Sequence, residues 1–205
     1  MNVLEKSLVV FVGNSTLSIV EQYKLQLKTH SPFIFLLPHK NDVVFEKLFH
    51  VLQLDPKCDQ EALAFEGERG GSYFITDVAA PFIKTKREEN VALVNTHGPI
   101  LTELIMEYDS LLLIGESSCS FDAIVLEYLI KQAAQFDKET HVISWCPIRS
   151  ELAHENDQLL RNAIDKYNVK HTVVTANDEE PDGFLSLFKA YNKEIAQTVH
   201  RAFQQ

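Results

Sequence analysis

The side chains best suited to binding chemistry lie in one short polar loop. Residues 109–114 read DSLLLI, an apolar run typical of a buried strand, and the next six residues read GESSCS. A strand that passes through a polar loop into a helix is where an α/β sheet can hold a phosphate, through backbone N–H groups and the helix dipole. Four residues of this loop are therefore candidate ligands for an anion or a nucleotide: Gly115, Ser117, Ser118 and Ser120.

The glycine content of this loop is low for a phosphate site. A phosphate cradle usually has several glycines, because glycine lets the backbone approach the ligand closely. Here Gly115 stands alone and Glu116 adds a carboxylate, while the whole chain has only 7 glycines in 205 residues. The sequence thus predicts a nucleotide site that is lost or altered.

The same loop also has a purely structural interpretation. Ser118 or Ser120 would cap the helix that follows, and Asp122 would lie in its first turn. Asp122 and Glu127 would then form part of a solvated helix face. Both interpretations of the loop remain open at this point.

A nucleophilic role for Cys119 is a further hypothesis. A cysteine near a helix N-terminus has a lowered thiol pKa, and a nucleophile also needs a base, for which His97, His141 and His154 are the candidates. The corresponding enzyme would have a Rossmann-like fold and act on a small phosphorylated or nucleotide substrate. The eight histidines show no HxH or HExxH spacing, so no metal site is predicted.

Composition narrows the class of protein. The formal net charge of −10 argues against nucleic acid or an anionic membrane surface as a partner. Three cysteines without CxxC spacing are typical of a reduced protein, and we expect a cytoplasmic location. No signal-peptide pattern occurs, and no apolar run approaches the ~20 residues of a membrane span.

Apolar runs alternate with helical patterns along the whole chain. Strands are predicted at residues 7–12, 32–37, 111–114, 141–146 and 171–175, and helices at 17–28, 43–54, 99–108, 121–135, 151–167 and 183–203. Residues 55–72 lack a clear pattern, and 73–90 fit either a helix or irregular structure. The alternation predicts one Rossmann-like α/β domain over 1–205, with a mainly parallel sheet and helices on both faces.

From residue 109 onwards, the order of elements resembles the nucleotide-binding domain of the tubulin and FtsZ superfamily. The quoted segments are LLLIG at 111–115, HVISWCP at 141–147, VVTAND at 173–178 and AYNKEIA at 190–196. VVFVG at 9–13 lies where the family has its first strand and first glycine loop. The resemblance implies GTP or GDP as the ligand, with Gly13, Asn14 and Ser15 at the first phosphate loop and Asn192 reading the purine.

The chain also departs from the family pattern. The family has a run of glycines around a threonine where this chain has GESSCS, and consecutive glycines where it has GNST at 13–16. Glu116 beside phosphates would cost a few kcal/mol. The family's second domain and catalytic acidic loop have no counterpart before Gln205. The resemblance therefore implies a degenerate pocket with little or no GTPase activity, or a guanine-nucleotide binder without efficient hydrolysis.

The final predicted helix carries many apolar residues. The residues that predict an exposed apolar stripe are Phe184, Leu185, Leu187, Phe188, Ile195, Val199 and Phe203. In the family a second domain covers the central helix, so the resemblance implies a partner surface here. We therefore expect a protein partner or self-association, for example a homodimer formed through this helix.

Overall fold

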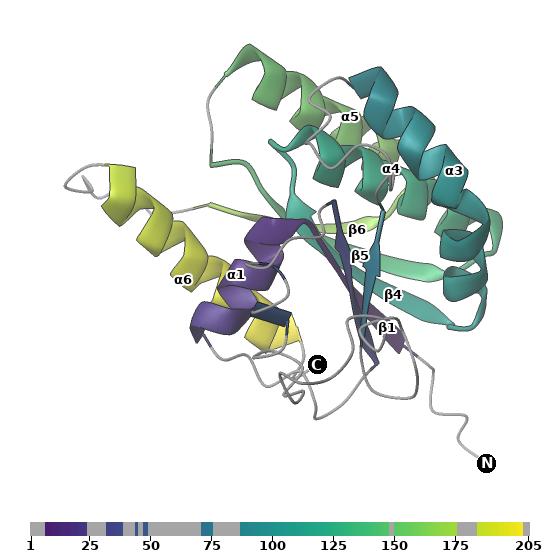
Figure 1. Ribbon diagram of the computed structural model, residues 1–205, viewed down its shortest axis with the longest axis horizontal. Coiled ribbons are helices and arrows are strands. Elements are labelled where there is room, and N and C mark those ends of the chain that lie inside the picture. The colour runs from purple at the N-terminus through teal and green to yellow at the C-terminus, as the bar shows by residue number, and fades with distance from the viewer. Residues whose placement is uncertain are drawn as a thin grey trace.

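The protein forms a sheet flanked by two layers of helices (Figure 1). The computed structural model describes residues 7–23, 32–38, 44, 47–48, 71–75, 87–147, 150–175 and 184–202. The strands are β1 Ser7–Val12, β2 Phe33–Leu37, β3 Gly71–Phe74, β4 Ser110–Glu116, β5 Glu139–Trp145 and β6 Lys170–Val174. The helices are α1 Asn14–Tyr23, α3 Arg87–Met106, α4 Ser120–Gln135, α5 Glu151–Tyr167 and α6 Phe184–Ala202.

The six strands form one sheet in the order β3-β2-β1-β4-β5-β6, and all neighbouring pairs are parallel. β1 and β4 lie at its centre, where both faces are covered. Their sequences are accordingly almost continuous runs of β-branched and other apolar residues. The predicted α/β class with a parallel sheet is confirmed.

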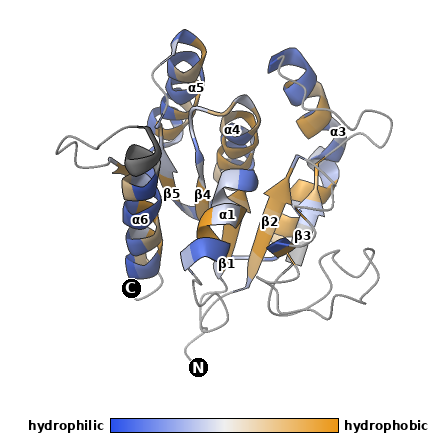
Figure 2. Ribbon diagram, turned by 60° about the vertical axis from the view of Figure 1, so that its left-hand side comes forward, coloured by the Kyte–Doolittle hydropathy of each residue, from blue (hydrophilic) through white to orange (hydrophobic). Residues whose placement is uncertain are grey.

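The helices divide between the two faces of the sheet. α3, α4 and α5 lie side by side on one face, and α1 and α6 pack together on the other (Figure 1). Each layer has its own apolar core, and the two cores meet at the central strands. In Figure 2 the strands at the centre of the sheet are mostly hydrophobic, and the helices on either side carry both hydrophobic and hydrophilic residues.

Three sequence predictions are corrected by the structure. Residues 71–74 form β3, a strand that the glycines at 70 and 71 concealed. α3 begins at Arg87 and continues through Pro99, which had been expected to start the helix. Its buried residues form one stripe at helical spacing on both sides of the proline: Asn90, Val94, Gly98, Leu101 and Ile105.

The third correction concerns Gly115. β4 extends to Glu116, so Gly115 lies inside the strand and not in the loop. Other predictions fall outside the described residues, including most of the helix at 43–54, where only 44, 47 and 48 are described, all as helical. Asn177 and Asp178, the last two residues of the quoted VVTAND segment, also lie outside the described residues.

Candidate functional site

The two predicted loops lie side by side at the carboxyl edge of the sheet. β1 and β4 are neighbours with Val12 opposite Gly115, so Gly13 and Glu116 leave the sheet at the same level. α1 begins at Asn14 and α4 begins at Ser120, directly after these strand ends. The structure thus places the two predicted loops next to each other at this edge, and a helix N-terminus follows each strand directly.

The space between the two loops is occupied by the side chain of Asp122. A Cβ added at Gly13 would collide with the Asp122 carboxyl group, and Gly13 has a φ of +85°. Only glycine gives both the conformation and the room that this contact requires. The glycine that the family resemblance assigns to phosphate binding here accommodates a carboxyl group of the chain itself.

Asp122 is held in a position where an anion would be favourable. It is the third residue of α4, it is 2% exposed, and its Oδ2 accepts a hydrogen bond from the backbone N–H of Glu116 at 3.3 Å. Burial raises the pKa of Asp122 well above its usual range, and the nearby charge of Glu116 raises it further. The expectation of a solvated Asp122 is therefore wrong, because its side chain turns inward between the loops.

The hydroxyl of Ser117 is also engaged within the chain. Ser117 is fully buried, and its Oγ donates to Oδ1 of Asp157 on α5 at 2.5 Å and lies 3.2 Å from the Trp145 carbonyl. Asp157 in turn accepts a hydrogen bond from Arg161 at 2.6 Å. The Ser117 hydroxyl, which could donate to a bound phosphate, therefore donates to the Asp157 carboxylate instead.

Ser118 and Ser120 have internal partners as well. Ser118 Oγ donates to Oε1 of Glu116 at 2.5 Å, and the Ser118 carbonyl accepts from the Asn156 amide at 3.0 Å. Ser120 Oγ accepts from the Asn90 amide at 3.2 Å. Neither serine caps α4, because the N-cap is Cys119, which makes no side-chain capping bond.

Gly115 is explained by packing. A Cβ at this position would lie 2.9 Å from Cδ1 of Leu126 and 3.4 Å from Cβ of Val12. The first distance is shorter than real Cβ contacts, so glycine lets α4 pack closely on the sheet. Packing alone therefore explains a glycine at position 115, without a bound phosphate.

Asn14 and Ser15 begin α1 and are both partly buried. Within the described part of the chain, the Oδ1 of Asn14 is a buried side-chain atom without a hydrogen-bond partner. An acceptor oxygen suits a donor such as an amide or a hydroxyl, and it does not suit a phosphate oxygen.

Asn192 lies away from the two loops. Its amide is 3.5 Å from Oε1 of Gln22, which is in the last turn of α1. Gln22 is eight residues beyond Asn14, so this contact lies about 12 Å along α1 from the loop. The structure therefore does not place Asn192 beside the other predicted ligands.

The thiol of Cys119 is poorly suited to nucleophilic attack. Its surroundings raise its pKa to about 12, through burial of the sulfur and the neighbouring Asp122 carboxyl, despite the exposure of the residue as a whole. The predicted lowering of the pKa by the helix N-terminus is thus wrong. His97 is hydrogen-bonded to Tyr73 at 2.7 Å and His141 to Thr172 at 2.9 Å, so both have partners elsewhere.

Three residues that hold this edge closed were not predicted: Asn90, Asn156 and Asp157. Asn90 lies on the buried stripe of α3 and Asn156 on that of α5, each near the helix N-terminus. A polar residue at an apolar position of a helix was the available signal for both. Nothing in the sequence pattern indicated Asp157, since it is brought to Ser117 only by the packing of α5 beside α4.

Two structural features relevant to ligands are absent from the described residues. No three His, Cys, Asp or Glu side chains gather there as they would around a metal ion. No helix in the same ranges is long and apolar enough to cross a membrane.

The sequence matches no protein-family model and no curated protein. Solved structures do match. They include the empty FtsZ dimer of M. jannaschii (TM-score 0.68, 10% identity, 98% of this chain and 55% of that chain). They also include the monomeric subunit of TubZ from Bacteriophage PhiKZ (TM-score 0.65, 10% identity, 97% of this chain and 60% of that chain). A third is the GTPγS-bound protofilament of CetZ2 from Haloferax volcanii (TM-score 0.61, 13% identity, 97% of this chain and 58% of that chain).

This chain therefore spans a little more than half the length of these proteins. At such low identity the likeness concerns the fold alone. The strand order, the two helical layers and these matches together give the chain the fold of the nucleotide-binding domain of tubulin and FtsZ.

Proposed function

We propose that this chain is a divergent tubulin/FtsZ-like domain whose nucleotide pocket is closed by its own side chains. It acts as a binding, regulatory or self-associating module with little or no GTPase activity. The observation that carries this proposal is the buried Asp122 carboxyl group between Gly13 and the backbone of Glu116.

The arrangement of carboxyl groups supports a loss of phosphate binding. Glu116 accepts a hydrogen bond from Ser118, Asp122 from the Glu116 N–H, and Asp157 from Ser117, so three donors at this edge are bonded to carboxyl groups of the chain. A nucleotide would have to displace these groups and remain beside them. A phosphate charge 4 Å from a charged Glu116 carboxylate would be repelled by about 4 kcal/mol at the effective dielectric of a protein surface. Phosphate groups carrying several charges would meet a larger barrier.

Self-association is supported by the structural relatives. FtsZ of M. jannaschii is described as a dimer, and CetZ2 of Haloferax volcanii as a protofilament with GTPγS bound. Their fold thus supports assembly between copies, and in CetZ2 assembly occurs with a nucleotide present. We extend assembly to this chain and propose that it no longer depends on GTP or GDP.

Calorimetric titration with GTP, GDP and ATP in the presence of Mg²⁺ tests the proposal. We expect no measurable heat of binding and no phosphate release by the unmodified chain. The matched variant combines Glu116→Gly with Asp122→Gly, which removes two carboxyl groups, one at the end of β4 and one in the first turn of α4. Because the obstacle is then gone, we expect this variant to bind GDP more tightly than the unmodified chain does.

Sub-micromolar binding of GTP or GDP by the unmodified chain would overturn the closed pocket. In that case the chain is a guanine-nucleotide binder with unusual contacts, and Asn192→Ala should lower its preference for guanine. If the glycine variant folds, as judged by circular dichroism, and gains no affinity, the two carboxyl groups are not the reason for the loss.

A further inference from the structure

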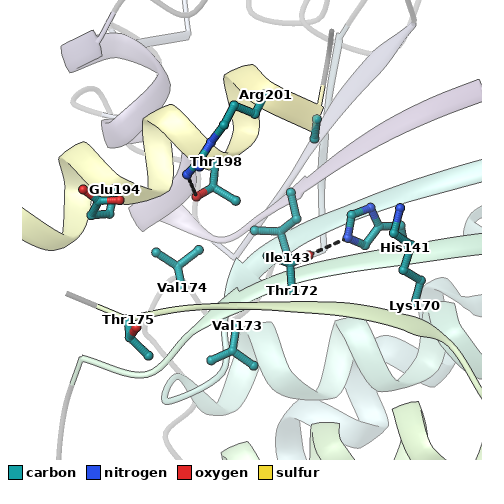
Figure 3. Close-up of a pocket in the computed structure, with 11 residues that line it drawn as sticks. His141, Ile143, Lys170, Thr172, Val173, Val174, Thr175, Glu194, Thr198 and Arg201 are labelled. Atoms are coloured by element: carbon teal, nitrogen blue, oxygen red, sulfur yellow. Dashed lines mark hydrogen bonds between the residues drawn. The ribbon is translucent and has the colours of Figure 1, made fainter. Parts of the chain in front are cut away.

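A groove runs along the outer strand of the sheet, away from the closed edge. It has a volume of about 600 Å³ and lies between β6, the adjoining part of β5 and one side of α6 (Figure 3). The residues that matter here are polar or charged and come from all three elements: His141, Lys170, Thr172, Glu194, Thr198 and Arg201.

The groove exists because α6 packs over the middle of the sheet. Ile195, Ala196 and Val199 are buried in the core that also contains Phe11 and Trp145. The predicted exposure of Ile195 and Val199 is therefore wrong, and the side chains at 184–188 and 203 lie outside the described residues. The neighbouring flank of α6, which faces β6, is polar, so it offers no apolar stripe to a partner helix.

The outer edge of β6 is unpaired in the described part of the chain. β6 is the last strand in the sheet order, and its hydrogen-bonding ladder is formed with β5 only. Its sequence, KHTVV, ends in three β-branched residues, and Val173 is 40% exposed. A free edge with these residues favours the addition of another strand.

Opposite charges lie at the two ends of the groove. Figure 3 places Lys170 and His141 at one end, and Glu194 with Thr175 at the other. If β6 of a second copy ran antiparallel to this strand, Lys170 of each copy would therefore lie towards Glu194 of the other. This self-complementarity is what a two-fold interface requires.

We propose that two copies of this chain associate by antiparallel pairing of their β6 strands, which joins the two sheets into one. The proposal rests on the self-association proposed above and names the surface that carries it. Backbone hydrogen bonds between the strands supply the attraction, and the contacts between Lys170 and Glu194 across the two-fold axis fix the orientation.

The alternation of side chains restricts the register. Residues directly opposite in an antiparallel pair lie on the same face of the sheet. A two-fold axis perpendicular to the sheet keeps the α6 face of one copy continuous with that of the other. The register must therefore place one residue, Thr172 or Val173, directly opposite the same residue of the other copy. With Thr172 on the axis, Lys170 lies opposite Val174 of the other copy, at the end of its groove where Glu194 is found.

Charge reversal tests this interface in the full chain. Sedimentation velocity over a range of concentrations should show a monomer–dimer equilibrium for the unmodified protein. Lys170→Glu and Glu194→Lys should each weaken the dimer by about tenfold, since each dimer contains two copies of the contact. The double variant Lys170→Glu with Glu194→Lys should recover most of the loss. Lys131→Glu, on the exposed side of α4, makes the same charge change elsewhere and should have no effect.

Cysteine crosslinking provides a second readout. Thr172→Cys places two thiols opposite each other at the axis, so mild oxidation should give a covalent dimer that the unmodified chain, with its own cysteines, does not form. The same substitution at exposed Thr96 on α3 is the matched control and should give none.

The outcomes separate the two proposals. A chain that stays monomeric at every concentration contradicts both self-association and the β6 interface. A dimer that is unaffected by either charge reversal and is not crosslinked through position 172 contradicts the β6 interface alone, and self-association through another surface stands.

Discussion

The closed edge at β1 and β4 and the open edge at β6 differ in how their polar groups are used. At the closed edge, the serine hydroxyls and the Glu116 N–H are bonded to groups of the chain itself. Along β6, the outer backbone groups have no strand beside them among the described residues. The polar groups that follow β4 are thus bonded within the chain, whereas a peripheral strand offers unused bonding capacity. At the start of α1, the Oδ1 of Asn14 has no partner among the described residues.

A parallel sheet can thus present two helix N-termini at one edge while the side chains there bond to one another. The central strands still deliver two helix N-termini to one point, which is the feature that favours an anion. A buried carboxyl group from α4 now occupies that point. The helices remain where they are because their apolar faces hold them, independently of any phosphate.

The largest expected effect comes from forcing the closed edge apart. Gly13→Ala places a methyl group against the Asp122 carboxyl group and imposes an unfavourable φ, so it should lower the free energy of unfolding by about 3 kcal/mol. Urea unfolding measures the change. In an Asp122→Ala background the collision is absent, and the same substitution should cost only about 1–2 kcal/mol. Equal costs in the two backgrounds would mean that Asp122 does not fill this space.

The pH dependence of stability is a second test of whether the Asp122 side chain is buried. Because the pKa of Asp122 is raised in the folded chain, the folded state binds its proton more tightly than the unfolded state does. The stability that this group contributes is therefore fully present below its unfolded pKa of about 4 and is lost as the pH rises from there through the folded pKa, at up to about 1.4 kcal/mol per pH unit. Asp122→Asn cannot titrate, so its free energy of unfolding should fall less steeply over this range. Parallel profiles for the two proteins would show an ordinary, solvated Asp122.

The loop hydroxyls should differ in importance. Ser117→Ala removes the buried donor to Asp157 and should lower the free energy of unfolding by about 1–2 kcal/mol. Ser118→Ala removes a bond to the less buried Glu116 and should cost under about 1 kcal/mol. Thermal unfolding of both variants gives the order. A larger effect at Ser118 would contradict the description of Ser117 as the internally bonded centre of the loop.

The smallest effect is expected at Asn192. Its side chain makes one long contact with Gln22 at the protein surface, so Asn192→Ala should change the free energy of unfolding by less than about 0.5 kcal/mol. Nucleotide titrations should also be unchanged. A measurable change in guanine-nucleotide binding would mean that Asn192 contributes to a site that the loops still form.

The sequence predicted the class of fold because hydrophobic periodicity is a local property. Residues 7–12 and 151–167 were placed correctly since their patterns are continuous and end at clear breaks. β3 was missed because four residues beside glycines carry too little periodicity. The N-terminal part of α3 was missed because Pro99 suggested a helix start.

The side-chain contacts at the β1 and β4 edge could be predicted only to a small extent. The excess of acid and the shortage of glycine at 115–120 predict an altered pocket, and this stays a prediction. The inward turn of Asp122 depends on how α4 packs beside the end of β1, and the contact between Ser117 and Asp157 depends on how α5 packs beside α4. Ser117 and Asp157 are 40 positions apart in sequence, and no local pattern encodes such a contact.

A crystal structure of the chain grown with GTP and Mg²⁺ would show directly whether a nucleotide can enter this edge. We expect the Asp122 carboxyl group against Gly13, hydrogen-bonded to the Glu116 N–H, with no nucleotide beside Ser117. Phosphate density between Gly13 and Ser117, with the Asp122 side chain turned away, would contradict it.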